Sequence, residues 1–255
     1  MGRRNERGFT LVELLIVVTI ISMLAGLLLP TVGRAMEQGR RSACASNIKE
    51  IVRACRAYSL ERRWSQGTTA YGLPTVKPAS GNWHLSNSGN RACLWLTIKY
   101  NYASPGIFVC PSLKAKDHQI AKVADGQFDA GGNLTCGYSY ISMVDRGNSG
   151  APPVLSADDA YPAMVIVADK NPRFNAGSKS VVSGTSRTTR SNSHRSLGGQ
   201  AEGQNVGRLD ESGAWLETPV VLTGTNRTDW IWEPVAPGSD GSGRAGGKYD
   251  VFLIP

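Results

Sequence analysis

The hydrophobic residues of this chain are concentrated in one block near its amino terminus. Residues 9–29 read FTLVELLIVVTIISMLAGLLL, about 21 residues with a single ionisable side chain, Glu13. As an α-helix, a block of this length crosses the roughly 30 Å hydrocarbon core of a bilayer. Three arginines against one glutamate precede it within residues 1–8. Because basic flanks stay in the cytoplasm, the pattern predicts a transmembrane helix at 9–29 with the remainder of the chain on the far side.

The next segment, residues 30–63, has the pattern of an amphipathic helix. Its apolar residues recur at spacings of three and four, which places them on one helix face; they are Met36, Ala43, Cys44, Ile48, Ile51, Val52, Cys55 and Tyr58. Joined to the first block, this segment predicts one helix of about 55 residues and about 80 Å. Pro30 lies inside that helix, where the missing N–H and the ring clash predict a kink.

Cys44 and Cys55 are expected to be core residues of this helix. They share a face but lie roughly 16 Å apart along it, which is too far for a disulfide. The neighbouring sequence supplies no histidine to complete a metal site with them.

Residues 64–255 differ from the helix in composition, being rich in Gly, Ser, Thr, Asn and Pro. Residues 94–102 have the spacing of a short helix, and several short apolar runs predict strands; these are residues 137–144, 163–168, 204–209, 214–217 and 251–254. The predicted fold class is therefore α+β, with a long amino-terminal helix packed on a small antiparallel sheet in a β-rich globular head.

One turn in this head has candidate metal ligands. Residues 205–209 and 214–217 read as a hairpin joined by Asp210-Glu-Ser-Gly213, which contains the turn formers Asp and Gly. Calcium prefers six to eight oxygen ligands, and Asp210 and Glu211 are the candidates here, with Asp169 and Asn171 scattered further off. An ordinary polar turn explains the same residues, so no cofactor is required.

Composition and motifs exclude most enzyme classes. The chain has 255 residues, 41% of them hydrophobic, and a net charge of +8 without any run of six basic residues, which argues against a nucleic-acid tail. None of its three histidines belongs to a zinc-binding H-E-x-x-H motif, and neither G-x-S-x-G nor a phosphate-binding P-loop occurs. We therefore predict a protein that is not an enzyme.

Glu13 stands out because a charge within a transmembrane helix costs roughly 3 kcal/mol. A cut between Gly8 and Phe9 would create an α-amine one helical turn from this carboxylate, in the same chain or in a neighbouring copy. That amine would neutralise Glu13 within a bundle of packed helices.

The segment Gly8-Phe-Thr-Leu-Val-Glu13, with its basic leader and apolar stretch, closely resembles the processing signature of type IV prepilins and type II secretion pseudopilins. The resemblance implies that a prepilin peptidase removes leader 1–8 and methylates Phe9, and that Glu13 sets subunit register. It also implies an inner-membrane subunit with a cytoplasmic amino terminus and a periplasmic or extracellular head. Its expected partners are membrane lipid, other pilin or pseudopilin subunits, and an assembly platform with its own ATPase.

Segments of the head resemble large pilin-like proteins with β-rich heads; these are Phe108–Ser112, Cys136–Tyr140, Ala168–Pro172 and Ser193–Asp210. The likeness fails at Asp210-Glu-Ser-Gly-Ala-Trp215, which replaces an Asp-Gly-His-Val turn. Disulfides persist outside the cytoplasm, and Cys110 with Cys136 is the predicted pair because both adjoin strand-like runs, although free thiols fit equally well.

A different function remains open from sequence alone. A monomeric, membrane-anchored module that binds polysaccharide or DNA would have the same anchor, the six tryptophans and the basic charge. It would keep the leader 1–8 that a pilin loses.

Overall fold

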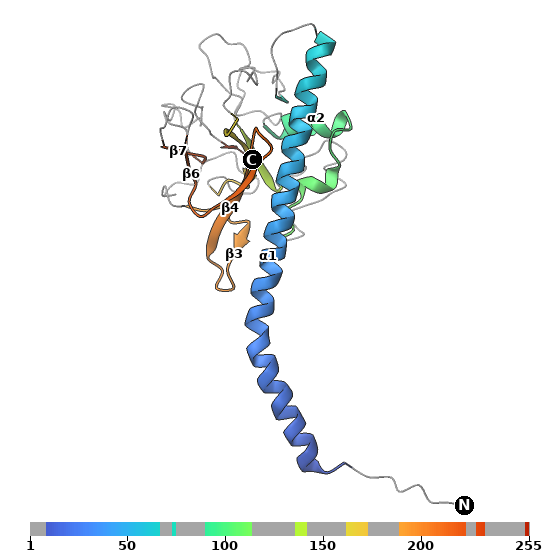
Figure 1. Cartoon of the computed structure of the whole chain (residues 1–255), viewed down its shortest axis with the longest axis vertical. Coiled ribbons are helices and arrows are strands. Elements are labelled where there is room, and N and C mark those ends of the chain that lie inside the picture. The colour runs from blue at the N-terminus through green and yellow to red at the C-terminus, as the bar shows by residue number, and fades with distance from the viewer. Residues whose placement is uncertain are drawn as a thin grey trace, which may run out of the picture.

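A single helix runs the whole length of the molecule and carries a head on its carboxyl-terminal half (Figure 1). The computed structural model describes residues 9–66, 73–74, 90–113, 136–141, 162–172, 189–222, 228–232 and 253–254. The leader 1–8, including Gly8, lies outside the described residues. The long helix and the antiparallel sheet confirm the predicted α+β, pilin-like fold class.

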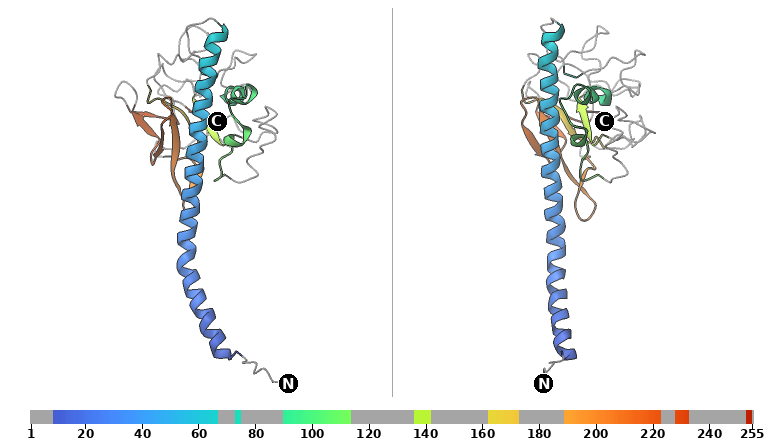
Figure 2. Two further views of the ribbon diagram at one scale, coloured as in Figure 1. Left: turned by 45° about the vertical axis from the view of Figure 1, so that its right-hand side comes forward. Right: turned by 90° about the vertical axis from the view of Figure 1, so that its right-hand side faces the viewer.

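Helix α1 spans Leu11–Gln66, 56 residues, which agrees with the predicted helix to within a few residues at each end. Pro30 lies inside it and the helix continues past this residue. The part of α1 below the head curves gently, as two views agree (Figures 1 and 2). Pro30 removes one N–H from the intrahelical ladder, which lets the helix bend without ending.

The main sheet has six strands, with β3, β4, β2, β1 and β8 in that order and β5 also paired to β4. All of its pairings are antiparallel. The strands are β1 (Tyr138–Ile141), β2 (Val165–Asp169), β3 (His194–Arg195), β4 (Ala201–Arg208), β5 (Gly213–Leu216) and β8 (Leu253–Ile254). A separate pair is formed by β6 (Val220–Leu222) and β7 (Thr228–Trp230).

The upper half of α1 packs on this sheet through the face that its sequence spacing predicts. Ile48, Ile51 and Val52 have no exposed surface, and they contact the same core as Val206 of β4. Met36 and Ala43 belong to the predicted stripe but are exposed. At the level of Met36 the head contacts another face of α1, where a Cβ at Gly33 would lie 2.7 Å from Leu197 and Glu37 contacts His194. The apolar stripe is therefore buried from Cys44 onward.

Helix α2 (Asn90–Lys99) and the short 3-10 helix η1 (Pro105–Phe108) lie beside α1, on the side away from β4 (Figure 2). Phe108 and Leu94 bring their side chains into the common core. All four residues of β1 are buried; the strand lies between β2 and β8 in the sheet and contacts α2. The chain segment after η1 is thereby brought against the middle of α1.

Candidate functional site

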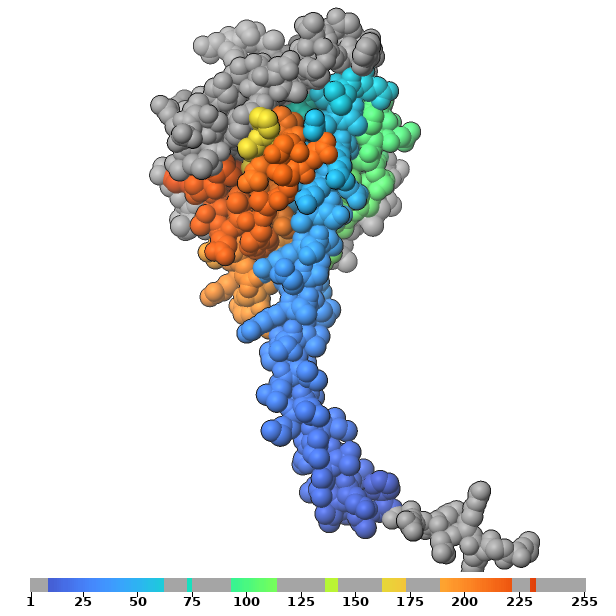
Figure 3. Space-filling view, viewed as in Figure 1, coloured from blue at the N-terminus to red at the C-terminus, as the bar shows by residue number. Residues whose placement is uncertain are grey.

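The amino-terminal part of α1, residues 11–29, is called its lower half below. With Phe9 just before it, this part exposes an almost unbroken apolar surface. Phe9 and Leu11 are each 80% exposed and Leu29 is 73% exposed. Among the described residues, α1 is the helix long and apolar enough to cross a membrane, and its most apolar window has no buried residue. The space-filling view shows this stem standing free of the head (Figure 3). A patch of this size marks a surface that is covered by lipid or protein.

Glu13 takes part in a capping box at the start of this helix. The backbone N–H and the hydroxyl of Thr10 both donate to Glu13 Oε2, at 2.9 and 2.8 Å, and Thr10 Oγ1 accepts from the Glu13 N–H at 3.3 Å. These bonds satisfy donors that the first helical turn leaves free. The Thr-x-x-Glu spacing that signals such a cap is present in the sequence, so this second role of Glu13 was predictable alongside its charge.

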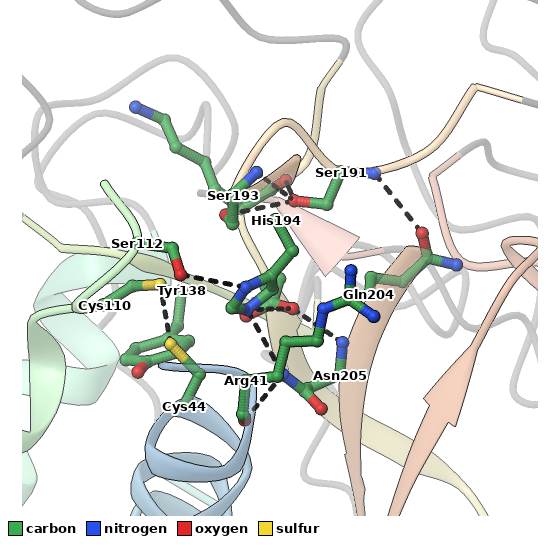
Figure 4. A network of polar contacts seen from close by, with 12 residues as sticks. Arg41, Cys44, Cys110, Ser112, Tyr138, Ser191, Ser193, His194, Gln204 and Asn205 are labelled. Atoms are coloured by element: carbon green, nitrogen blue, oxygen red, sulfur yellow. Dashed lines mark hydrogen bonds and ion pairs between the residues drawn. The ribbon is translucent and has the colours of Figure 1, made fainter. Parts of the chain in front are cut away.

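The head contains a second polar constellation, which sequence reasoning missed. Cys44 of α1, Cys110 after η1, Asp169 at the end of β2 and His194 of β3 each have no exposed surface. One potential ligand atom from each lies within 4.8 Å of those of the other three. Figure 4 shows Cys44, Cys110 and His194 converging from separate elements. These four residues are called the buried cluster below.

The two sulfurs of the buried cluster are 2.7 Å apart. Cys110 is therefore not bonded to Cys136, whose Sγ donates instead to the Tyr138 carbonyl at 3.4 Å. The prediction of a Cys110–Cys136 disulfide is wrong because Cys110 faces α1. Cys44 and Cys55 are core residues, as predicted. The neighbouring sequence offers Cys44 no histidine, yet the fold brings one beside it from 150 positions further along the chain.

His194 is held at both ring nitrogens. Its Nδ1 lies 2.8 Å from Glu37 Oε1 and 3.0 Å from Ser112 Oγ. Its Nε2 lies 3.4 Å from Asp169 Oδ2 and 3.3 Å from Asn205 Nδ2. Burial lowers the pKa of His194, but Asp169, Cys44 and Glu37 outweigh it and raise the pKa to about 10. The ring is thus set between two carboxylates.

The thiols differ in acidity. The hydrogen bond from Cys110 lowers the pKa of Cys44 to about 6, against the effect of burial. The same bond, with burial, raises the pKa of Cys110 far above its usual value. A thiolate at Cys44 beside a protonated His194 would suit a nucleophile, but neither side chain has any surface that a substrate can reach. The arrangement favours a structural role.

Asp210 and Glu211 do not join a metal-ligand group within the part of the chain that the structure describes. Glu211 binds Arg53 and Arg56 of α1 at 3.3 and 2.9 Å, while Asp210 Oδ1 accepts from the Ser212 N–H at 2.9 Å. The Asp210 N–H donates to the Pro162 carbonyl, which precedes the start of β2, whereas Asp169 lies at the opposite end of that strand. Asp210 and Asp169 are therefore at different ends of β2. The scattered calcium candidates are therefore not assembled.

Comparison with known proteins agrees with these features. The family described as prokaryotic N-terminal methylation motif matches residues 3–29. The type II secretion system core protein G of Pseudomonas aeruginosa is 34% identical over 128 residues, which cover 50% of this chain and 89% of that protein. The Escherichia coli protein of the same name is 32% identical over 86 residues, 31% of this chain and 59% of its own.

A pilus protein is also similar to this chain. The type IV wide pilus major component PilA4 of Thermus thermophilus is 34% identical over 58 residues, which cover 23% of this chain and 44% of that protein. No solved structure matches. With its prepilin motif, its long helix and its antiparallel head, the chain belongs to the family of pilin-like proteins that includes the type II secretion system core protein G.

Proposed function

We propose that the chain is cut after Gly8, methylated at Phe9 and held in the inner membrane by residues 9–29, and that it then assembles with other pilin-like subunits into a filament. The same apolar helix serves both stages, because a membrane and a bundle of like helices each cover its surface. The amino terminus would face the cytoplasm before processing, and the head would be periplasmic or extracellular.

The observation that carries this proposal is the exposed apolar lower half of α1, interrupted by one carboxylate. The large apolar side chains from Leu11 to Leu29 are each about half exposed or more among the described residues, so most of their surface is left uncovered by a single chain. In a simple membrane anchor the charge of Glu13 would only be unfavourable, at roughly 3 kcal/mol in hydrocarbon. In a helix bundle that supplies a positive partner, the same charge would form an ion pair between subunits.

The capping box makes this argument sharper. Thr10 gives hydrogen bonds to Glu13, but it is neutral and leaves the negative charge in place. Both bonds reach Oε2, and a carboxylate has a second oxygen that can accept from a cation. The α-amine of Phe9 on an adjacent subunit, freed by the cut after Gly8, is the proposed cation. Glu13 would then fix the axial register between neighbouring helices.

The remaining expected partners follow from this pathway. A prepilin peptidase would make the cut, and an assembly platform with a separate ATPase would extract the subunit from lipid. The relatives are named for type II secretion and for a type IV pilus, and both kinds of machine are consistent with the proposal.

The test is filament assembly by Glu13→Gln. Glutamine keeps the capping box, since it can occupy the same position of that motif, but it removes the charge. We expect the variant to be inserted and processed yet absent from sheared or cross-linked filaments, while Glu50→Gln, on the exposed surface of the same helix, assembles normally. Assembly of Glu13→Gln at the wild-type level would show that the charge has no role in register.

A further inference from the structure

Four side chains of the buried cluster offer the donor set of a transition-metal site. Two sulfurs, one imidazole nitrogen and one carboxylate oxygen lie within 4.8 Å of one another. Thiolate and imidazole ligands favour zinc over magnesium or calcium, which take oxygen ligands. Four ligands from the protein alone make a closed, tetrahedral, structural site rather than a catalytic one.

Asp169 gives independent evidence that something is missing from this pocket. Its side chain has no exposed surface, and its Oδ1 has no hydrogen-bond partner among the described residues. Its Oδ2 accepts from the Asn205 N–H at 2.6 Å and faces His194 Nε2. A buried carboxylate oxygen without a hydrogen-bond partner destabilises the fold, and a bound cation would remove that penalty.

The surroundings of His194 match those of a metal-bound histidine. Glu37 Oε1 lies 2.8 Å from Nδ1, so this carboxylate accepts a hydrogen bond from Nδ1–H and leaves the lone pair of Nε2 free for an ion. Metal-ligating histidines commonly donate their other ring N–H to a carboxylate in this way. Asn205 Nδ2, 3.3 Å from Nε2, would give up that contact and keep its bond to the Arg41 carbonyl.

Zinc binding would require only a small increase in the distance between the two sulfur atoms. Zinc bonded to both at about 2.3 Å in tetrahedral geometry separates them by roughly 3.7 Å, about 1 Å more than the 2.7 Å between Cys44 Sγ and Cys110 Sγ. Small side-chain rotations provide this. With zinc bound, both cysteines would be thiolates. The divalent charge would then offset their charge and that of the Asp169 carboxylate, which lies away from water.

We propose that Cys44, Cys110, Asp169 and His194 bind one structural Zn²⁺ ion that joins α1 to the sheet of the head. The ligands come from α1, from the segment after η1, from β2 and from β3, so the ion ties α1 to these three parts of the head at one point. Figure 4 shows Cys44, Cys110 and His194 of this set. The alternative for two facing thiols outside the cytoplasm is a Cys44–Cys110 disulfide. That bond would leave Asp169 Oδ1 without a partner and gives no reason for the position of His194.

The first experiment measures the metal content of the full-length chain, isolated from membranes in detergent without chelator or reductant. We expect about one zinc per chain, and both Cys44 and Cys110 recovered as unmodified thiols after denaturation in chelator. The variants Cys44→Ser and Asp169→Asn should each lose zinc. Cys55→Ala is the matched control, because Cys55 is equally buried on the same helix and lies outside the cluster.

A second measurement uses the wild-type protein, so it does not depend on whether a variant folds. Exchange of the wild-type protein with Co²⁺ should give the intense visible absorption of tetrahedral cobalt together with thiolate-to-cobalt charge-transfer bands. Glu37→Gln, a change in a positioning residue, should weaken zinc affinity about 10- to 100-fold while leaving these bands in place.

Two results would overturn the proposal. One is a Cys44–Cys110 disulfide in the isolated chain. The other is a chain that is isolated without zinc and, after addition of Co²⁺, shows neither tetrahedral cobalt absorption nor thiolate-to-cobalt charge-transfer bands. Retention of zinc by Cys44→Ser and Asp169→Asn would equally place the ion elsewhere. The inference is independent of filament assembly, because processing and the role of Glu13 concern the other half of α1.

Discussion

Gly207 of β4 lies directly against Ile48 of α1. A Cβ atom built at Gly207 would be 2.5 Å from Ile48 Cγ2 and 2.8 Å from Val52 Cγ2, closer than carbon atoms approach in folded proteins. The absent side chain is what lets the stalk helix sit on the middle of the sheet. The junction between stalk and head thus depends on a close approach of helix side chains to a strand backbone.

Gly207→Ala should destabilise this junction. We expect a loss of about 1–3 kcal/mol in the free energy of unfolding, because the added methyl overpacks a core formed by branched side chains. Thermal unfolding of the full chain in detergent measures it. Gly106→Ala, where an added Cβ meets nothing within 4 Å, is the control and should change Tm little. Equal Tm values for the two variants would contradict the close packing described here.

Glu211 provides a second, weaker link between stalk and head. It has a left-handed backbone, with φ of 68°, at the tip of the β4–β5 turn and binds two arginines of α1. Because these groups are partly exposed, Glu211→Gln should cost no more than about 1 kcal/mol in unfolding free energy. Salt should reduce the difference between variant and wild type. A difference that stays the same at 1 M salt would show that charge is not its source.

The fold was largely predictable from periodicity. The apolar residues from Cys44 to Cys55, which recur with a helical period of 3.6, and the apolar block before Pro30 predicted α1. The turn residues from Asp210 to Gly213 predicted the β4–β5 hairpin, whose register pairs Gly207 with Gly213. These signals are local, since each depends on neighbours within one or two turns. The predicted strands β1 and β2 were likewise found, with ends shifted by a few residues.

The buried cluster was not predictable by the same means. Cys44, Asp169 and His194 lie on three elements and Cys110 follows η1. Only the packing of α1 on the sheet brings these four residues together, because their sequence positions form no recognised ligand motif. Two weak signals were present: Cys110 directly precedes a proline and Asp169 ends an apolar strand. Neither indicates a partner. The pair β6 and β7 was also missed, because its runs are only three residues long.

Gly8→Val should block processing, because the proposed cut requires a small residue at that position. The expected product is a membrane-bound precursor that retains residues 1–8 and does not enter filaments, visible as a band of higher mass. A leader variant at a neighbouring position, Arg7→Lys, preserves the basic flank and should be processed normally. Efficient cleavage of Gly8→Val would contradict the assigned cut site.

The central claim is that this chain is a processed pilin-like subunit, and the intact mass and amino-terminal sequence of the protein from its native membrane test it most directly. The account predicts a mature chain that begins with N-methylated Phe9. A chain that retains Met1 to Gly8 without modification would contradict it and would favour a simple membrane-anchored binding module.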